Sequence, residues 1–165
     1  MPELSLVAGV ARTGAIGDGE TIPWHYEADE RQYKERVAGH PVVVGRKTWA
    51  GMTDVEGTHP VVFTSSPDEY DAEDATFVGS VPEAVAAVAE RDDAGYVIGG
   101  QSVYATMLPY ADRAFVSELP EYEIGSKVFP YLGTDWTVVG REAYDEFDVV
   151  EYRHENPRPV AAAED

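Results

Sequence analysis

Residues 41–49 read PVVVGRKTW, and this stretch passes from a strand into a helix through one glycine. The valines at 42–44 are apolar on both faces of an extended chain, which is typical of a parallel strand covered by helices on both sides. Gly45 lets the backbone approach a ligand closely, and Arg46 and Lys47 are adjacent cations at the beginning of the helix. Free N–H groups and the positive end of the helix dipole favour an anion there. We therefore predict a phosphate contact; the alternative is a solvated helix start with two surface cations.

A second junction of this kind lies at residues 95–104, GYVIGGQSVY, where the glycine pair 99–100 separates an apolar strand from a helix. A Gly-Gly pair alone is a weak signal. Two such junctions in one small domain predict two phosphate contacts, as a dinucleotide needs, at the carboxyl ends of the strands. Thr64 and Ser65 follow a third strand and would add hydroxyls at the same edge. Residues 9–17 superficially resemble a Rossmann glycine loop, but the spacing is wrong.

The remainder of the chain alternates apolar runs with helical patterns, which predicts an α/β fold with right-handed crossovers. We predict strands over 4–11, 41–46, 60–65, 75–78, 95–100, 113–119, 136–144 and 147–154, and helices over 26–38, 46–52, 80–91 and 101–108. The last two strands follow each other closely and should form an antiparallel hairpin. The expected architecture is a single domain, residues 1–154, with a predominantly parallel central sheet of about eight strands and helices on both faces. Residues 155–165 are expected to be a frayed acidic tail.

The composition is strongly acidic, with 31 Asp and Glu against 12 Lys and Arg and a formal net charge of -19. Such a field repels nucleic acid and anionic membranes, so we expect neither as a partner. The acids are spread along the chain, which favours adaptation to concentrated salt over an acidic interaction segment. The absence of Cys excludes disulfides and thiolate metal sites, and we expect no metal. No apolar run approaches the ~18 residues of a membrane span, so we expect a cytoplasmic protein. We also expect a monomer.

One acid stands out at the beginning of the first predicted helix. Asp29 lies in the first turn, and Tyr33 follows four residues later on the same face. If that face packs on the sheet, Asp29 lies in an apolar pocket beside Tyr33, Val7 and Ile98. Burial favours the protonated form of a carboxyl group, which suits a general acid or a group that pairs with an amino-pyrimidine edge. An exposed acid that complements the helix dipole is the equally weighted alternative, because Glu27 and Glu30 occupy the same turn.

Three motifs, in order and at family-like spacing, make the chain resemble dihydrofolate reductases from about residue 4 to residue 153. They are Ala8 with Ile16-Gly17, Pro23-Trp24 and Asp29; Val42 with Gly45-Arg46 and Thr48-Trp49; and Tyr96 to Tyr104. The resemblance implies reduction of dihydrofolate with NADPH as hydride donor. Asp29 would be the only ionisable group in the pterin pocket, Trp24 would hold an ordered water, and Ser117 would support this network. The loop over 12–26 would close over the nicotinamide.

The same resemblance implies the binding residues. For the substrate they are Val7, Ala8, Asp29, Tyr33, Lys34, Met52, Ile98 and Ser117. For NADPH they are Ala8, Ile16, Gly17, Gly45, Arg46, Lys47, Thr48, Thr64, Ser65, Ile98, Gly99, Gly100, Gln101, Ser102, Val103 and Tyr104. Within this set, Arg46, Lys47 and Ser65 would lie near the 2′-phosphate.

The chain departs from the family at two places. Before the third strand, family members usually have an Arg for the glutamate tail of folate, but residues 56–60 read EGTHP. A family GDxxFP motif that braces the loop is replaced by GSKVFP at 125–130. The rival interpretations are a pyrimidine reductase of the riboflavin pathway on the same fold, an inactive NADPH- or pterin-binding protein, and a plain acidic interaction domain. The Trp24…Asp29 pair argues against the first, retention of Asp29 against the second, and the two glycine junctions against the third.

Overall fold

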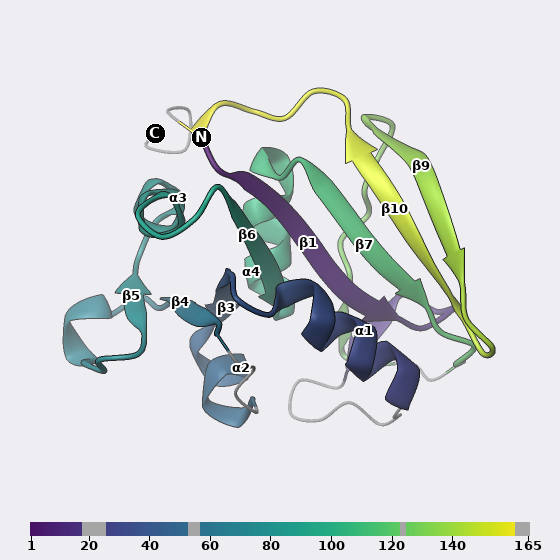
Figure 1. The fold of residues 1–165 in the computed structure, drawn as a ribbon, viewed down its shortest axis with the longest axis horizontal. Helices are drawn as coiled ribbons and strands as arrows, with labels where there is room; N and C mark the ends of the chain where they lie inside the picture. Colours follow the sequence, from purple (N-terminus) through teal and green to yellow (C-terminus); the bar gives the residue numbers. More distant parts are fainter. Residues whose placement is uncertain (18–25, 53–56, 123–124, 161–165) are drawn as a thin grey trace.

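An eight-stranded sheet forms the centre of the molecule, in the order β5-β4-β3-β6-β1-β7-β10-β9 (Figure 1). The computed structural model describes residues 1–17, 26–52, 57–122 and 125–160. The strands of this sheet are β1 (Glu3–Val10), β3 (Pro41–Gly45), β4 (His59–Phe63), β5 (Thr76–Val78), β6 (Ala94–Gly99), β7 (Arg113–Glu118), β9 (Trp136–Ala143) and β10 (Asp148–His154). All pairs from β5 to β7 are parallel, whereas β10 is antiparallel to both β7 and β9. The predicted parallel sheet and C-terminal hairpin are confirmed.

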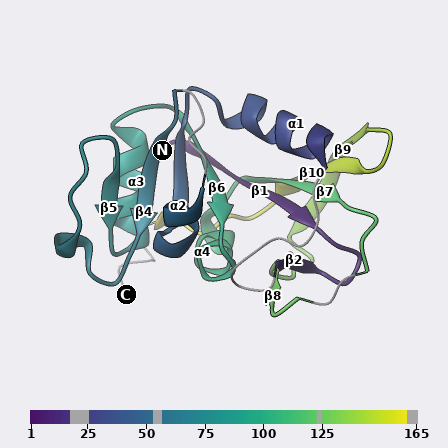
Figure 2. The same ribbon diagram turned by 90° about the horizontal axis from the view of Figure 1, so that it is seen from below.

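Helices cover both faces of the sheet, as predicted (Figure 2). They are α1 (Glu27–Val37), α2 (Arg46–Gly51), α3 (Val81–Ala89) and α4 (Gln101–Met107), with short 3-10 turns η1 (Pro67–Glu69) and η2 (Leu108–Tyr110). Alternate residues of a strand face opposite sides, which explains the two-sided valine run. Val43 packs in the same cluster as α3 and α4, whereas Val42 packs with Val37 of α1. Val44 packs with Trp49 of α2.

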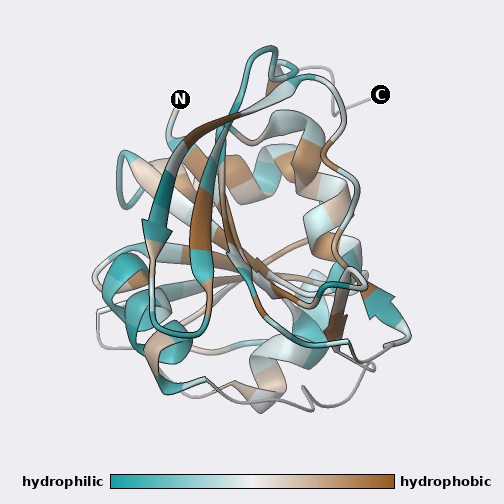
Figure 3. Ribbon diagram, turned by 90° about the vertical axis from the view of Figure 1, so that its right-hand side faces the viewer, coloured by the Kyte–Doolittle hydropathy of each residue, from teal (hydrophilic) through white to brown (hydrophobic). Residues whose placement is uncertain are grey.

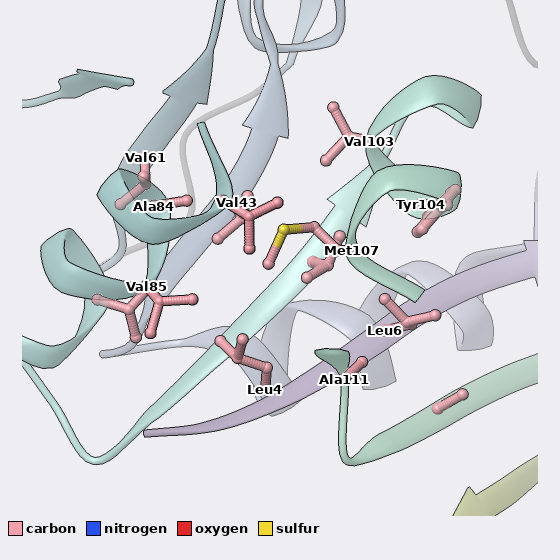
Figure 4. Close-up of a cluster of buried hydrophobic side chains, with 14 of the residues drawn as sticks. Leu4, Leu6, Val43, Val61, Ala84, Val85, Val103, Tyr104, Met107 and Ala111 are labelled. Carbon is pink, nitrogen blue, oxygen red and sulfur yellow. The ribbon is translucent and has the colours of Figure 1, made fainter. Parts of the chain in front are cut away.

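The largest buried cluster lies between the sheet and helices α3 and α4 (Figure 4). Met107 of α4 reaches toward Val43, while Val85 of α3 and Leu4 of β1 lie below it in this view. Leu4, Val43 and Met107 are all at most 1% exposed. In Figure 3, brown marks strand segments and parts of the helices, whereas teal marks turns and other helical turns. This rigid core holds the carboxyl ends of the strands in place.

The structure contains a small sheet that the sequence analysis did not predict. β2 (Ala15–Gly17) and β8 (Lys127–Val128) form a separate two-stranded antiparallel sheet. Both strands are too short to show a periodic pattern, and their partners are far apart in the sequence. The backbone N–H of Val128 donates to Gln101 Oε1 over 2.7 Å, which fixes β8 beside the beginning of α4.

Residues 155–160 of the tail contact the body of the protein. The Glu155 N–H donates to Asp135 O over 2.7 Å, and the Arg158 N–H donates to Pro109 O over 2.8 Å. Val160 packs against the main core cluster. Fraying of the tail from residue 155 stays a prediction, and residues 161–165 lie outside the described residues. None of the helices described is long and apolar enough to span a bilayer.

Candidate active site at the carboxyl ends of the strands

A cavity of about 1220 Å³ opens where β1, β3, β4 and β6 end. It brings together the two strand–helix junctions and the first turn of α1, which are separated in the sequence. Its lining includes most of the predicted site residues: Val7, Ala8, Ile16, Asp29, Tyr33, Gly45, Arg46, Lys47, Thr48, Met52, Thr64, Ser65, Ile98, Gly99, Gly100, Gln101, Ser102, Val103 and Tyr104. The predicted position of a ligand site at this edge of the sheet agrees with the geometry.

Charged side chains divide this cavity into two halves. Arg46 and Lys47 line it at the beginning of α2, and Lys127 lines it from β8, beside the beginning of α4. Asp29 and Glu30 line it from α1. We call the first region the cation half and the second the acid half. All 12 Lys and Arg residues of the chain fall within the described ranges. The comparison of the two halves therefore takes every Lys and Arg of the protein into account.

The cation half is built from the two glycine junctions. Gly45 is the N-cap of α2 and Gly100 is the N-cap of α4, and neither provides a side-chain cap for its helix. The two junctions touch: a Cβ added at Gly45 would lie 3.3 Å from Val103 Cγ2, and one added at Gly100 would lie 3.3 Å from Thr48 Oγ1. Gly99 has a φ of +121°, and the Gly99–Gly100 peptide bond is cis. Without side chains at these turns, the backbone N–H groups stay accessible from the cavity.

The acid half contains a hydrogen-bond network around Asp29. Ser117 Oγ donates to Asp29 Oδ1 over 2.5 Å, and Gln32 Nε2 donates to the same oxygen over 2.9 Å. A Cβ added at Gly9 would lie only 2.9 Å from Asp29 Oδ2, so glycine at this position of β1 leaves room for the carboxylate. Ser117 itself is buried behind Asp29, at 2% exposure. Asp29 is half-buried, so the structure favours the buried-face interpretation over a freely solvated acid.

Two tyrosines border the acid half. The Tyr104 hydroxyl donates to Val7 O over 2.6 Å inside the core, and burial raises the pKa of Tyr104 far above its usual range. Burial likewise raises the pKa of Tyr33 to about 12. Both phenols therefore stay neutral at physiological pH and supply apolar surface and one structural hydrogen bond.

Of the predicted site residues in the described part of the chain, Lys34 and Ser117 do not line the cavity. Lys34 forms an ion pair with Glu30 at 2.7 Å on the surface of α1. Ser117 lies behind Asp29. Gly17 is the last residue of β2. Trp24 falls outside the described residues, as does most of the predicted closing loop.

Sequence reasoning missed several lining residues: Gly9, Tyr26, Glu30, Gln32, Gly51, Phe63, Gly79, Thr106 and Lys127. Gln32 is the most consequential of these, because it binds the Asp29 carboxylate directly. Its spacing of three residues from Asp29 places both on one helix face and was the available signal. The position of Lys127 depends on the small β2–β8 sheet, whose strands are too short to show a pattern in the sequence.

Comparisons with known proteins agree on one class of enzyme. A solved structure of dihydrofolate reductase from Enterococcus faecalis, complexed with NADP(H) and RAB-propyl, superposes with a TM-score of 0.83 at 26% identity, covering 93% of this chain and 97% of that one. The family model for dihydrofolate reductase matches residues 3–156. The chain belongs to the dihydrofolate reductase family.

Two curated relatives have similar sequences. Dihydrofolate reductase 1 of Haloarcula marismortui is 41% identical, with 96% of this chain and 95% of the relative covered. Dihydrofolate reductase HdrB of Haloferax volcanii is 36% identical, with 92% and 84% covered. The resemblance inferred from the three motifs is therefore confirmed over almost the whole chain.

Proposed function

We propose that this protein reduces 7,8-dihydrofolate to 5,6,7,8-tetrahydrofolate with NADPH. The observation that carries the proposal is the division of one cavity into a cation half and an acid half, on the fold of this family. NADPH supplies a hydride from C4 of its nicotinamide to C6 of the pterin, while a proton is added at N5. The products are tetrahydrofolate and NADP⁺, so electrons and protons balance.

The cation half suits the cofactor. Arg46 and Lys47 would bind the 2′-phosphate together with Ser65, because charge-assisted hydrogen bonds are the strong ones. The two uncapped helix starts would offer N–H groups to the pyrophosphate, and their glycines allow the close approach that this requires. Further contacts would come from Ala8, Ile16, Gly17, Thr48, Thr64 and residues 98–104. The local cations offset the net charge of -19 where the anionic cofactor binds.

The acid half suits the pterin. Asp29 would accept hydrogen bonds from N3 and the 2-amino group and promote protonation at N5, with Trp24 holding an ordered water. Ser117 would act through Asp29, which it already binds. The apolar walls would come from Val7, Ala8, Tyr33, Met52 and Ile98. Closure of the loop over 12–26 would exclude water from the hydride path.

We also propose that the protein works as a cytoplasmic monomer without nucleic-acid partners. A net charge of -19 disfavours both self-association at low salt and binding to phosphate backbones. Light scattering at several salt concentrations, with and without DNA, tests this assignment. A concentration-dependent dimer would contradict it.

The function is tested by following the near-ultraviolet absorbance of NADPH in molar KCl. We expect the absorbance to fall when dihydrofolate is added and to stay constant with NADPH alone. A protein that binds NADPH and dihydrofolate without oxidising the cofactor would overturn the proposal.

A further inference from the structure

Gln32 occupies the centre of a closed polar network under the acid half. Its side chain is buried at 8% exposure. Its Nε2 donates to Asp29 Oδ1 over 2.9 Å and to Ser117 Oγ over 3.3 Å, and its Oε1 accepts from Arg36 Nε and Nη2 over 3.3 and 3.2 Å. These neighbours fix the orientation of the amide. The Arg36 guanidinium has only donors, and the Asp29 carboxylate has only acceptors. A flipped amide would therefore place its N–H groups against the guanidinium and its oxygen against the carboxylate.

The network treats the two oxygens of Asp29 differently. Oδ1 accepts from both Gln32 and Ser117. Oδ2 has no hydrogen-bond donor among residues 1–17, 26–52, 57–122 and 125–160, and it lies over Gly9 on the cavity wall. Within the described residues, the protein therefore holds Oδ1, whereas Oδ2 is available to a ligand in the cavity.

Arg36 anchors the far end of the network. Its guanidinium lies 4.1 Å over the ring of Phe115, which leaves the Arg36 donors directed at the amide oxygen of Gln32. Donors in series polarise one another, so the positive charge of Arg36 strengthens the N–H that Gln32 gives to the carboxylate. Arg36 itself has no carboxylate within 4 Å in the part of the chain that the structure describes.

We propose that Gln32, held by Arg36, is a positioning residue that fixes the Asp29 carboxylate with Oδ2 toward the pterin. The role in catalysis rests on the proposed reduction of dihydrofolate.

The other ionisable groups around Asp29 are ion-paired at the surface, neutral at physiological pH, or hydrogen-bonded to a different residue. On α1, Glu30 is ion-paired with Lys34 on the outer surface. Tyr33 on α1 and Tyr104 on α4 remain neutral because burial raises the pKa of each phenol. Tyr26, at the beginning of α1, donates to Glu121, and that hydrogen bond raises the pKa of Tyr26 to about 12. From β1 and β7, Gly9 and Ser117 bring no charge.

The test compares Gln32→Met, which keeps the side-chain length but removes the donor, with the wild type. The direct readout is the NMR resonance of the Asp29 carboxyl carbon in the ligand-free protein at one neutral pH, assigned by its loss in Asp29→Asn. We expect this resonance to shift and broaden in Gln32→Met, because the carboxylate loses a donor that fixes its orientation. KM for dihydrofolate should rise more than kcat falls.

Arg36→Met serves as a second variant if Gln32→Met does not fold, and it should shift the Asp29 resonance by a smaller amount. Arg31→Met is the matched control, because it removes the same charge from an exposed position of the same helix. Asp29 resonances in Gln32→Met and Arg36→Met that coincide with the Arg31→Met resonance would overturn the proposal. The measurement needs no turnover, so it decides about Gln32 even if the protein did not reduce dihydrofolate.

Discussion

The cation half and the acid half of the cavity solve opposite electrostatic problems by different means. The cation half uses backbone: two glycine junctions expose helix N-termini, and Arg46 and Lys47 follow directly in the chain. The acid half uses side chains from distant elements, since Asp29 and Gln32 of α1 meet Ser117 of β7. The contrast shows that a net charge of -19 does not decide what binds locally. Short-range donors and cations determine the sign of each half.

Replacement of Asp29 should have the largest effect on activity. Asp29→Asn keeps the shape of the side chain but cannot relay a proton, so we expect a loss of ~10²–10⁴-fold in turnover at neutral pH. Steady-state kinetics and a circular dichroism spectrum check activity and folding together. Glu27→Gln is the control, because it makes the same charge change at an exposed position in the same turn. Turnover of Asp29→Asn equal to that of Glu27→Gln would remove Asp29 from the chemistry.

Removing the cations should affect only the cofactor. Arg46→Ala combined with Lys47→Ala should reduce the preference for NADPH over NADH by about tenfold or more, since each charge-assisted contact contributes roughly 1.5–3 kcal/mol. The change should appear mainly in KM for NADPH. Arg31→Ala combined with Arg91→Ala has the same net charge and lies at exposed positions outside the cavity lining. An unchanged preference for NADPH over NADH would show that the 2′-phosphate binds elsewhere.

Salt should stabilise the fold as a whole but weaken ligand binding in the cation half. Screening of the self-repulsion should raise the melting temperature steeply with KCl up to molar concentrations. The same screening should weaken NADPH binding through the exposed Lys47. Thermal melting and fluorescence titration in one KCl series separate the two effects. A flat or falling melting temperature refutes adaptation to salt.

The smallest effect should come from the glutamate tail of folate. Thr58 occupies the position where the family has its Arg, and Lys34 is already ion-paired with Glu30. We expect dihydrofolate and an analogue without glutamate to differ by less than roughly 1.4 kcal/mol, a tenfold ratio in kcat/KM. Thr58→Arg should widen the ratio at moderate salt. A large ratio in the wild type that disappears in Lys34→Met would show that the helix binds the tail.

The cation half was predictable from the sequence because its signals are local. Gly45, Arg46 and Lys47 are consecutive, and the valine run before them indicates a buried parallel strand. The acid half was predictable only in part. Asp29 stood in a recognisable position, but its contact with Ser117 spans 88 residues and depends on the strand order.

Gln32 and Lys127 were missed for the same reason. Neither residue type signals a ligand by itself, and each reaches the cavity only through tertiary contacts. The beginning of α3 shows the opposite case, because its cap is made by neighbours in the sequence. Ser80 Oγ accepts from the Glu83 N–H, and Glu83 Oε2 accepts from the Gly79 N–H. Local chemistry is readable from the sequence, whereas partners across the sheet require the fold.

The central claim is that both halves act in one reaction, with Asp29 controlling the proton. Single-turnover hydride transfer from NADPH to dihydrofolate, measured from acidic to alkaline pH in the wild type and in Asp29→Asn, tests it most directly. We predict a rate that falls as pH rises in the wild type and a slow rate without that titration in Asp29→Asn. An unchanged titration in Asp29→Asn would contradict the claim, because another group would then control the proton.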